Sequence, residues 1–175
     1  MTTLSIRKEY ETLGVDTYYS DNADSYHNPH AVFALTCLDA LWNQEFKSVL
    51  DFACGDGLVS KHLKNKYPDI LVSGCDKFLH ERYLHETGNL TFSYSFEDVA
   101  NGLAQLPSVD VIVFSYAIDL VEKSYLNTML YYLSTISKNL IVIRPNSHIV
   151  EHFSWKAKQQ VKCEKAKAVL YTAVN

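Results

Sequence analysis

The sequence is poor in glycine, proline and cysteine, and it has no long apolar run. Only six of its 175 residues are glycine and four are proline. No Pro/Gly/Ser-rich linker divides it, so we expect a single domain over 1–175, close to the ~150 residues typical of one domain. Its aliphatic runs, such as 111–114 and 140–143, are far shorter than the ~20 apolar residues of a membrane span. The first residues lack the apolar core of a secretory signal. A membrane is therefore not an expected partner.

The cysteine pattern excludes two further classes. Four cysteines stand far apart, and none forms a Cys-x-x-Cys pair. This disfavours a disulfide framework or a thiolate zinc site, and it fits a cytoplasmic protein. The run 148–152 does match the His-x-x-Glu-His pattern of inverted zinc peptidases. It follows the last strand of an α/β pattern in a chain that is small for such an enzyme, so we interpret its histidines as surface residues and predict no metal.

Charge of one sign is not in large excess. Sixteen Lys and Arg face twenty Asp and Glu, for a formal net charge of −4. A generally basic nucleic-acid binder is therefore not expected. Five lysines do gather near the C-terminus, and we interpret them as a solvated face, with binding of RNA or an acidic partner as the alternative. They are Lys156, Lys158, Lys162, Lys165 and Lys167.

From residue 46 on, strand-like and helix-like segments alternate. The strands are expected at 48–52, 70–75, 90–94, 109–114 and 140–144. This alternation predicts an α/β, doubly wound, Rossmann-like fold with a mostly parallel sheet. Residues 1–45 are expected to form a helical N-terminal lid and a first helix, ahead of an α/β core over 46–175. A last strand at 168–174 is expected to pair with 161–164 as a short C-terminal strand pair.

The most informative loop follows the first strand, from Asp51 to Gly57. Gly55 and Gly57 lie between a strand and a helix, where a missing Cβ lets a ligand approach the backbone. A dinucleotide site needs Gly-x-Gly-x-x-Gly, and here the third glycine is missing. Asp51 would also face a pyrophosphate unfavourably, whereas it suits a cation with an amino acid tail. The loop therefore favours S-adenosylmethionine over a nicotinamide dinucleotide.

Two later strand ends extend this prediction. Asp76 follows the second strand, 25 residues after Asp51. This is close to the roughly 20-residue offset at which a carboxylate binds a ribose diol. After the third strand, Phe96 could flank an adenine and Glu97 could accept from its amino group. The alternative for this segment is a helix cap at Ser95 followed by acidic residues of the first turn.

On these residues the chain resembles the class I S-adenosylmethionine-dependent methyltransferases. The run 51–57 is similar to that superfamily's first motif, Asp76 to its ribose-binding acid, and 95–98 to its adenine-binding segment. The segment 114–117 falls at the end of its fourth strand. More narrowly, the chain resembles a group of small methyltransferase-like proteins through segments at 18–19, 26–30, 117–121 and 155–171. The resemblance implies sheet order 3-2-1-4-5 followed by a C-terminal strand pair.

The predicted cofactor is S-adenosyl-L-methionine, with S-adenosyl-L-homocysteine as the product. Residues of the lid and of the strand ends are expected to bind it. Tyr19 and Tyr26 of the lid are expected to pack on the sulfonium, since aromatic faces attract cations. Packing of a surface helix is the alternative for these tyrosines. The full cofactor-binding set is Tyr19, Tyr26, Asp51, Phe52, Ala53, Cys54, Gly55, Gly57, Asp76, Lys77, Ser95, Phe96, Glu97, Ser115 and Tyr116.

The acceptor site has weaker signals. His30, Tyr116 and Asp119 are the catalytic candidates, with His30 either a base near its ordinary pKa of about 6.5 or a first-turn helix residue. The fourth strand lacks the Asn/Asp-Pro-Pro-Tyr run used on planar amino groups. We therefore expect in-line methyl transfer to a small-molecule acceptor, and the sequence leaves open an oligomer or a partner subunit.

Two departures from the small group motivate an alternative function. Asp119 stands where that group commonly has His, and Arg-Pro-Asn-Ser-His at 144–148 replaces a Pro-His pair followed by basic residues. The alternative is a non-catalytic S-adenosylmethionine-binding subunit of a larger assembly. A nicotinamide oxidoreductase is a weaker third hypothesis, because the third glycine is missing.

Overall fold

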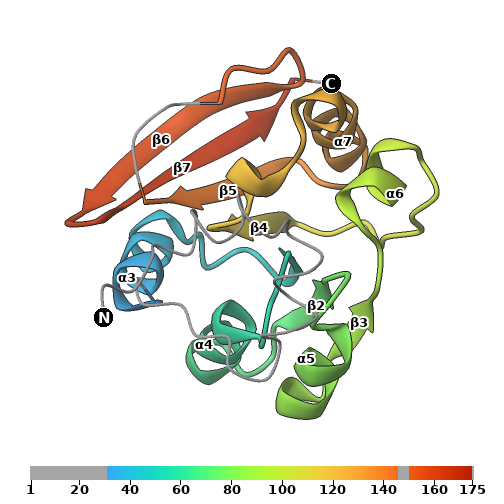
Figure 1. Ribbon diagram of the computed structural model, residues 1–175. Helices are drawn as coiled ribbons and strands as arrows, with labels where there is room; N and C mark the ends of the chain where they lie inside the picture. The colour runs from blue at the N-terminus through green and yellow to red at the C-terminus, as the bar shows by residue number, and fades with distance from the viewer. Residues whose placement is uncertain (1–30, 146–149, 175) are drawn as a thin grey trace, which may run out of the picture.

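The computed structural model describes residues 31–145 and 150–174, which form one twisted sheet with helices on both faces (Figure 1). Five strands follow helices in alternation, as the sequence pattern predicts. In chain order the elements are α3 (Ala31–Leu41), β1 (Ser48–Phe52), α4 (Leu58–Lys66), β2 (Leu71–Cys75), α5 (His80–Thr87), β3 (Leu90–Phe92), α6 (Phe96–Ala100), β4 (Val111–Ser115), the 3-10 turn η2 (Ile118–Leu120), α7 (Lys123–Ile136), β5 (Asn139–Arg144), β6 (Trp155–Cys163) and β7 (Ala166–Ala173).

The sheet order is β3-β2-β1-β4-β5-β7-β6. Strands β1 to β5 are all parallel, while β7 runs antiparallel to both β5 and β6. The order reverses after β3, so β1 and β4 lie side by side at the centre although two strands separate them in sequence. This confirms the doubly wound fold and the 3-2-1-4-5 order. In such sheets ligands bind at the carboxyl ends of the strands beside this reversal.

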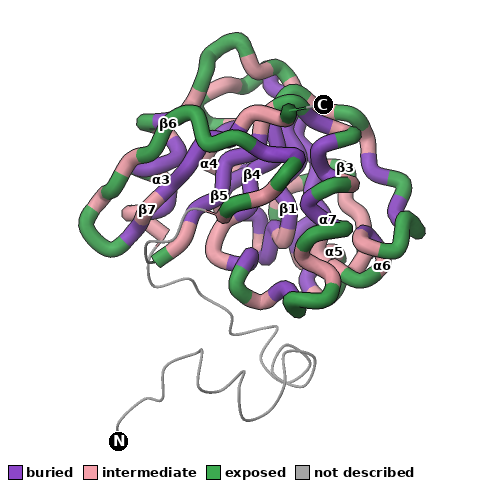
Figure 2. The backbone as a smooth tube through the Cα atoms, turned by 90° about the horizontal axis from the view of Figure 1, so that it is seen from above, coloured by how far each residue is buried: buried purple, intermediate pink, exposed green. Residues whose placement is uncertain are grey.

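The two faces of the sheet build two cores. Along β4, Val111 and Val113 pack with α3 and α4, while Ile112 and Phe114 pack with α6 and α7. Successive side chains of a strand point to opposite faces, so strands covered on both sides must be apolar throughout. Figure 2 shows these strands as the buried centre of the molecule. The core therefore fixes the strand ends that carry the candidate site.

The C-terminal strand pair is longer than the sequence pattern predicts. β6 spans nine residues and β7 eight, and a turn at Glu164, with φ of 47°, joins them. The expected boundary at 161–164 was wrong because most of β6 is exposed to solvent on both sides, so no alternation of apolar residues marks it. The register also shifts between Ala157 and Gln159, which interrupts the period of two. β7 itself is buried between β5 and β6.

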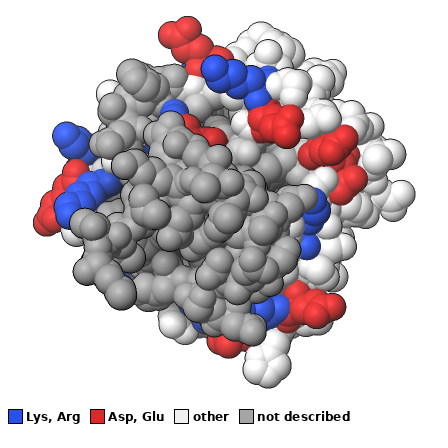
Figure 3. Space-filling view, in the orientation of Figure 1, with Lys and Arg blue, Asp and Glu red and all other residues white. Residues whose placement is uncertain are grey.

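The described surface carries both signs of charge. In Figure 3, Lys and Arg side chains alternate with Asp and Glu around the visible rim, and neither sign forms a continuous field on this face. Across the described ranges 31–145 and 150–174, no helix is long and apolar enough to cross a membrane.

Candidate functional site at the strand ends

Two residues with a left-handed backbone conformation come directly after the neighbouring central strands β1 and β4. Ala53 follows β1 with φ of 59°, and Tyr116 follows β4 with φ of 56°. A residue with a Cβ pays roughly 1–2 kcal/mol in this conformation. Each is held by the next strand: the N–H of Ala53 donates to the Cys75 carbonyl, and that of Tyr116 to the Ile143 carbonyl, both at 2.8 Å. Backbone strain maintained by such bonds is concentrated at functional sites, and here it marks the carboxyl edge of β1 and β4.

Asp51 lies below this edge and is almost fully buried, with 2% exposure. Its Oδ2 accepts hydrogen bonds from the Ser60 hydroxyl at 2.7 Å and the Ser60 N–H at 3.2 Å. The Ser60 Oγ also lies 2.9 Å from the Tyr83 hydroxyl. Burial raises the pKa of Asp51 to about 7, the hydrogen bonds from Ser60 oppose the rise, and the charges of Asp76 and Asp56 add to it. Asp51 thus anchors α4 and α5 beneath the loop.

Asp76 connects the glycine loop to the end of β2. Its Oδ2 accepts the Gly55 N–H at 3.1 Å, and its Oδ1 accepts the N–H groups of Phe78 at 2.9 Å and Leu79 at 2.8 Å. The carboxylate therefore caps the turn into α5 and fixes Gly55, which has φ of 54°. Two carboxylate oxygens offer about four acceptor positions. The three N–H groups occupy three of them. A ribose diol would take the remaining position and share or displace the bond to Gly55.

Gly57 is required for a different reason from the one that the loop pattern indicates. A Cβ on Gly57 would lie 2.5 Å from Thr87 Cγ2 and 3.1 Å from the Tyr83 ring. Its φ of 84° is also unfavourable for a side chain. The missing Cβ thus makes room for α5 rather than for a ligand. Gly74 serves the same ring, since its Cβ would lie 2.5 Å from Tyr83 Cζ.

The segment after β3 is a helix cap, the alternative that the sequence offers. The Ser95 hydroxyl accepts the Asp98 N–H at 3.0 Å, and Asp98 Oδ2 accepts the Ser95 N–H at 2.8 Å. Hydrogen bonds from Ser95 lower the pKa of Asp98. Glu97 stays exposed and accepts the Tyr125 hydroxyl at 3.1 Å. The cap leaves Glu97 available to a ligand, whereas Asp98 is committed to the cap.

Aromatic side chains lie under this segment. Phe52 and Phe114 are buried, with ring centroids 5.0 Å apart, and the half-buried Phe96 packs 5.8 Å from each. The Phe52 side chain therefore belongs to the core, and only its backbone is placed for a ligand. Phe96 lies at the outer edge of the cluster. Cys54 is buried too, and burial raises the pKa of its thiol.

The end of β4 holds two of the catalytic candidates. Burial raises the pKa of Tyr116 to about 12, with a smaller contribution from Cys37, and its ring packs on the α3 side of the sheet. Asp119, on η2, is exposed and forms a bidentate ion pair with Arg144 at the end of β5; Arg144 Nε lies 3.1 Å from Asp119 Oδ2. Ser115, which ends β4, is half-buried beside them. The sequence interpretation missed Arg144 as Asp119's partner, because nothing local links two residues on different loops.

Tyr19, Tyr26 and His30 lie outside the described residues, so their roles stay predictions. Lys77 is exposed at the tip of β2, 4.9 Å from the Phe78 ring, and its charge helps to lower the pKa of Asp98.

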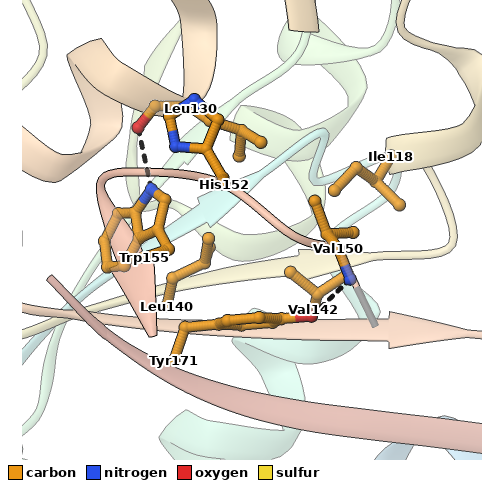
Figure 4. Close-up of a pocket in the computed structure, with 8 residues that line it drawn as sticks. All are labelled: Ile118, Leu130, Leu140, Val142, Val150, His152, Trp155 and Tyr171. Atoms are coloured by element: carbon orange, nitrogen blue, oxygen red, sulfur yellow. Dashed lines mark hydrogen bonds between the residues drawn. The ribbon is translucent and has the colours of Figure 1, made fainter. Parts of the chain in front are cut away.

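A separate apolar hollow lies behind η2, between α7 and the β5–β7 face (Figure 4). It is too tight for a water molecule, and its lining is hydrogen-bonded: Tyr171 Oη accepts the Val150 N–H at 2.9 Å, and Trp155 Nε1 donates to the Leu130 carbonyl at 2.8 Å. His152 Nδ1 accepts the Ser154 N–H, and Nε2 faces the Asn127 carbonyl at 3.0 Å. Both ring nitrogens of His152 are thus engaged, and burial lowers its pKa. Within 31–145 and 150–174, no three His, Cys, Asp or Glu side chains gather as a metal site.

Comparison with known proteins identifies the fold. No protein-family model matches the sequence, and neither does any curated protein. Solved structures do match. The pyocyanin biosynthetic protein PhzM superposes with a TM-score of 0.69 and 9% identity, over 96% of this chain and 67% of that protein. The O-methyltransferase NcsB1 of neocarzinostatin biosynthesis, solved with S-adenosylmethionine and 2-hydroxy-5-methyl naphthoic acid, gives 0.67 at 12% identity over 98% and 62%.

An rRNA methylase from Escherichia coli also matches, with a TM-score of 0.61 and 14% identity, over 97% of this chain and 77% of that one. The chain thus has the Rossmann-like fold of class I S-adenosylmethionine-dependent methyltransferases. It spans less than two thirds of the length of NcsB1 and of the mitomycin 7-O-methyltransferase MmcR, 62% of each.

Proposed function

We propose that this protein is a methyltransferase that uses S-adenosyl-L-methionine and acts on a small-molecule acceptor. The observation that carries the proposal is the bond between Asp76 Oδ2 and the Gly55 N–H. It places a carboxylate at the tip of β2 directly against the glycine loop that follows β1. A ligand with a ribose diol and a charged tail can contact both at once, and this is the combination that the cofactor presents.

The chain's residues fit this cofactor chemically. Asp76 would bind the ribose hydroxyls, Phe96 would pack on the adenine, and exposed Glu97 would accept from its amino group. Gly55 and the backbone at Ala53 would line the tail. When bound, the cofactor supplies a methyl group on a cationic sulfur, so the protein needs mainly to bind, orient and exclude water.

The described catalytic candidates act by positioning rather than by taking a proton. Tyr116 has a pKa near 12, so its hydroxyl stays protonated at neutral pH. Asp119 is neutralised by Arg144 and ties η2 to the end of β5. A base, where the acceptor needs one, would be His30, which remains a prediction.

A titration of the purified protein with S-adenosylhomocysteine tests the proposal, with NADH as control. Micromolar affinity for S-adenosylhomocysteine, with no binding of NADH, supports the proposed methyltransferase function. NADH binding without it would favour the oxidoreductase alternative.

The Asp119–Arg144 pair favours one second candidate, a cofactor-binding subunit without turnover. In this pair Arg144 binds the carboxylate of Asp119, which stands where the small methyltransferase-like group commonly has His. Cofactor binding without methyl transfer to any of a panel of phenols, amines, thiols and carboxylates would support this candidate, and any turnover would exclude it. The small-molecule class is favoured over RNA by the net charge of −4 and by O-methyltransferases among the structural matches.

A further inference from the structure

Three cationic residues stand in one row across the end of the sheet. Arg144 on β5 is in register with Lys167 on β7, and Lys167 is in register with Lys162 on β6. Residues in register on adjacent strands project to the same face, and strands lie about 4.8 Å apart. The three side chains, which we call the cation row, therefore start within roughly 10 Å of one another.

The core identifies the face on which the cation row lies. Val142 and Val169 stand two residues from Arg144 and Lys167 on the same strands, and both pack in the core shared with α7. Ala166 and Ala168, which flank Lys167, pack on the α3 side instead. The cation row thus projects from the α7 face.

The cation row also stands at the ligand-binding edge. Arg144 is the last residue of β5, and its neighbour Ile143 is in register with Ser115 at the end of β4. The hairpin turn at the β6–β7 tip follows one residue pair further on. The row therefore borders the strand ends that carry Tyr116 and η2.

Acidic partners among the described residues balance only one of the three cations. Asp119 neutralises Arg144, but among the described side chains no carboxylate forms an ion pair with Lys162 or Lys167. Like charges directly opposite each other on neighbouring strands destabilise a sheet. Lys167 is also half-buried, so solvent screens it only in part. An arrangement that costs stability at a ligand edge is expected where it serves a function.

We propose that the cation row binds an oxyanion, a carboxylate or a phosphate, on the small-molecule acceptor. This rests on the proposed function, since it names the acceptor class of the same site. Arg144 is already held by Asp119, so Lys167 and Lys162 provide the free ammonium groups, which act on oxyanions as point charges. Binding there would hold the acceptor at the ends of β5 and β7, on the side of the sheet edge next to β4.

The test is a titration of the 15N-labelled full chain with inorganic phosphate and, separately, with benzoate, followed through backbone amides at constant ionic strength. The test variant is K162Q/K167Q. The matched control is K156Q/K158Q, which also removes two positive charges, both from β6. Lys156 is in register with Thr172 on the opposite face, and Lys158 lies at the register shift. K162R/K167R serves as a rescue, since it keeps both charges.

We expect saturable shifts centred on residues 144, 162 and 167, at least tenfold weaker binding in K162Q/K167Q, and near-unchanged binding in the control and the rescue. Stronger binding of phosphate or of benzoate tells which oxyanion the row prefers. Shifts that do not saturate, or an equal loss in the control, would overturn the proposal. So would a single-stranded RNA that binds more tightly and weakens equally in both Gln variants. S-adenosylhomocysteine titrations of the same samples report separately on the proposed function.

Discussion

The Asp76 carboxylate binds the Gly55 N–H at 3.1 Å and, through its other oxygen, caps the turn into α5. One side chain thus has a structural task and the predicted ribose-binding task. The two are separable, because the cap uses Oδ1 and the loop contact uses Oδ2. Any test of Asp76 must therefore measure stability beside affinity.

Asp76→Asn should weaken S-adenosylhomocysteine by about 3 kcal/mol, more than 100-fold, since hydrogen bonds to a charged acceptor contribute about 1.5–3 kcal/mol each. Asn keeps an oxygen for the cap, so the fold should be retained. Calorimetry at a temperature where circular dichroism shows a folded protein gives the affinity. The matched control is Asp56→Asn, which removes a charge from the same loop, where Asp56 pairs with Arg82 at 3.8 Å. An equal loss in both variants would rule out a specific role for Asp76.

Gly57→Ala should destabilise the protein by about 3 kcal/mol, the sum of left-handed strain and overpacking against Thr87. Gly88→Ala is the control: its φ is 67°, but no atom lies within 4 Å of the new Cβ. It should cost only about 1–2 kcal/mol. Urea unfolding measures both. Partial recovery is expected in the double variant G57A/T87S, which removes the clashing Cγ2. Equal losses in the two single variants would show that packing against α5 is not the cause.

Asp51 should make stability fall with rising pH. Its pKa is 3.8 when unfolded and about 7 when folded. Below pH 4 the carboxyl is neutral in both states. Between pH 4 and 7 only the unfolded state loses the proton, so the free energy of unfolding falls, by up to about 4 kcal/mol. Above pH 7 the loss is complete and constant.

The side chain in the Asp51→Asn variant cannot ionise, so the free energy of unfolding of this variant should lack the fall between pH 4 and 7. The measurement is urea unfolding of both proteins from pH 4.5 to 8, with the wild type losing stability relative to the variant. A constant difference between the two across this range would contradict a raised pKa for Asp51.

Thiol reactivity should separate the four free cysteines. Burial raises the pKa of Cys37 and of Cys75 to about 12, and it raises that of Cys54 as well. The thiolate is the reactive form, so in the folded protein at pH 8 only the half-buried Cys163 should react quickly with a disulfide reagent. Unfolding in urea should expose all four. Rapid reaction of a second thiol in the folded protein would contradict the packing around it.

The fold was predictable because its strands are short apolar runs separated by helical periods. β1, β4 and β5 are buried on both faces, so their composition alone indicates central strands. β6 was not predictable in full, because it is exposed on both sides and carries a register shift. Its exposed lysines form no local sequence pattern that would distinguish a strand from a loop.

The sequence predicted which strand ends meet at the candidate site, but not the contacts of each residue there. The loop after β1 and Asp76 do meet at the sheet edge. The sequence could not show that Gly57 faces α5, because that contact depends on Thr87 and Tyr83 in another βα unit. Nor could it pair Asp119 with Arg144, which only the assembled sheet brings together. Ser95 could be interpreted either way, and the geometry shows the cap.

Calorimetric titration with S-adenosylhomocysteine tests the central claim most directly. The account predicts a single site of micromolar affinity, about −8 kcal/mol. Asp76→Asn should weaken this binding more than 100-fold, and Asp56→Asn should keep it. A folded protein that binds neither S-adenosylhomocysteine nor S-adenosylmethionine would contradict the account.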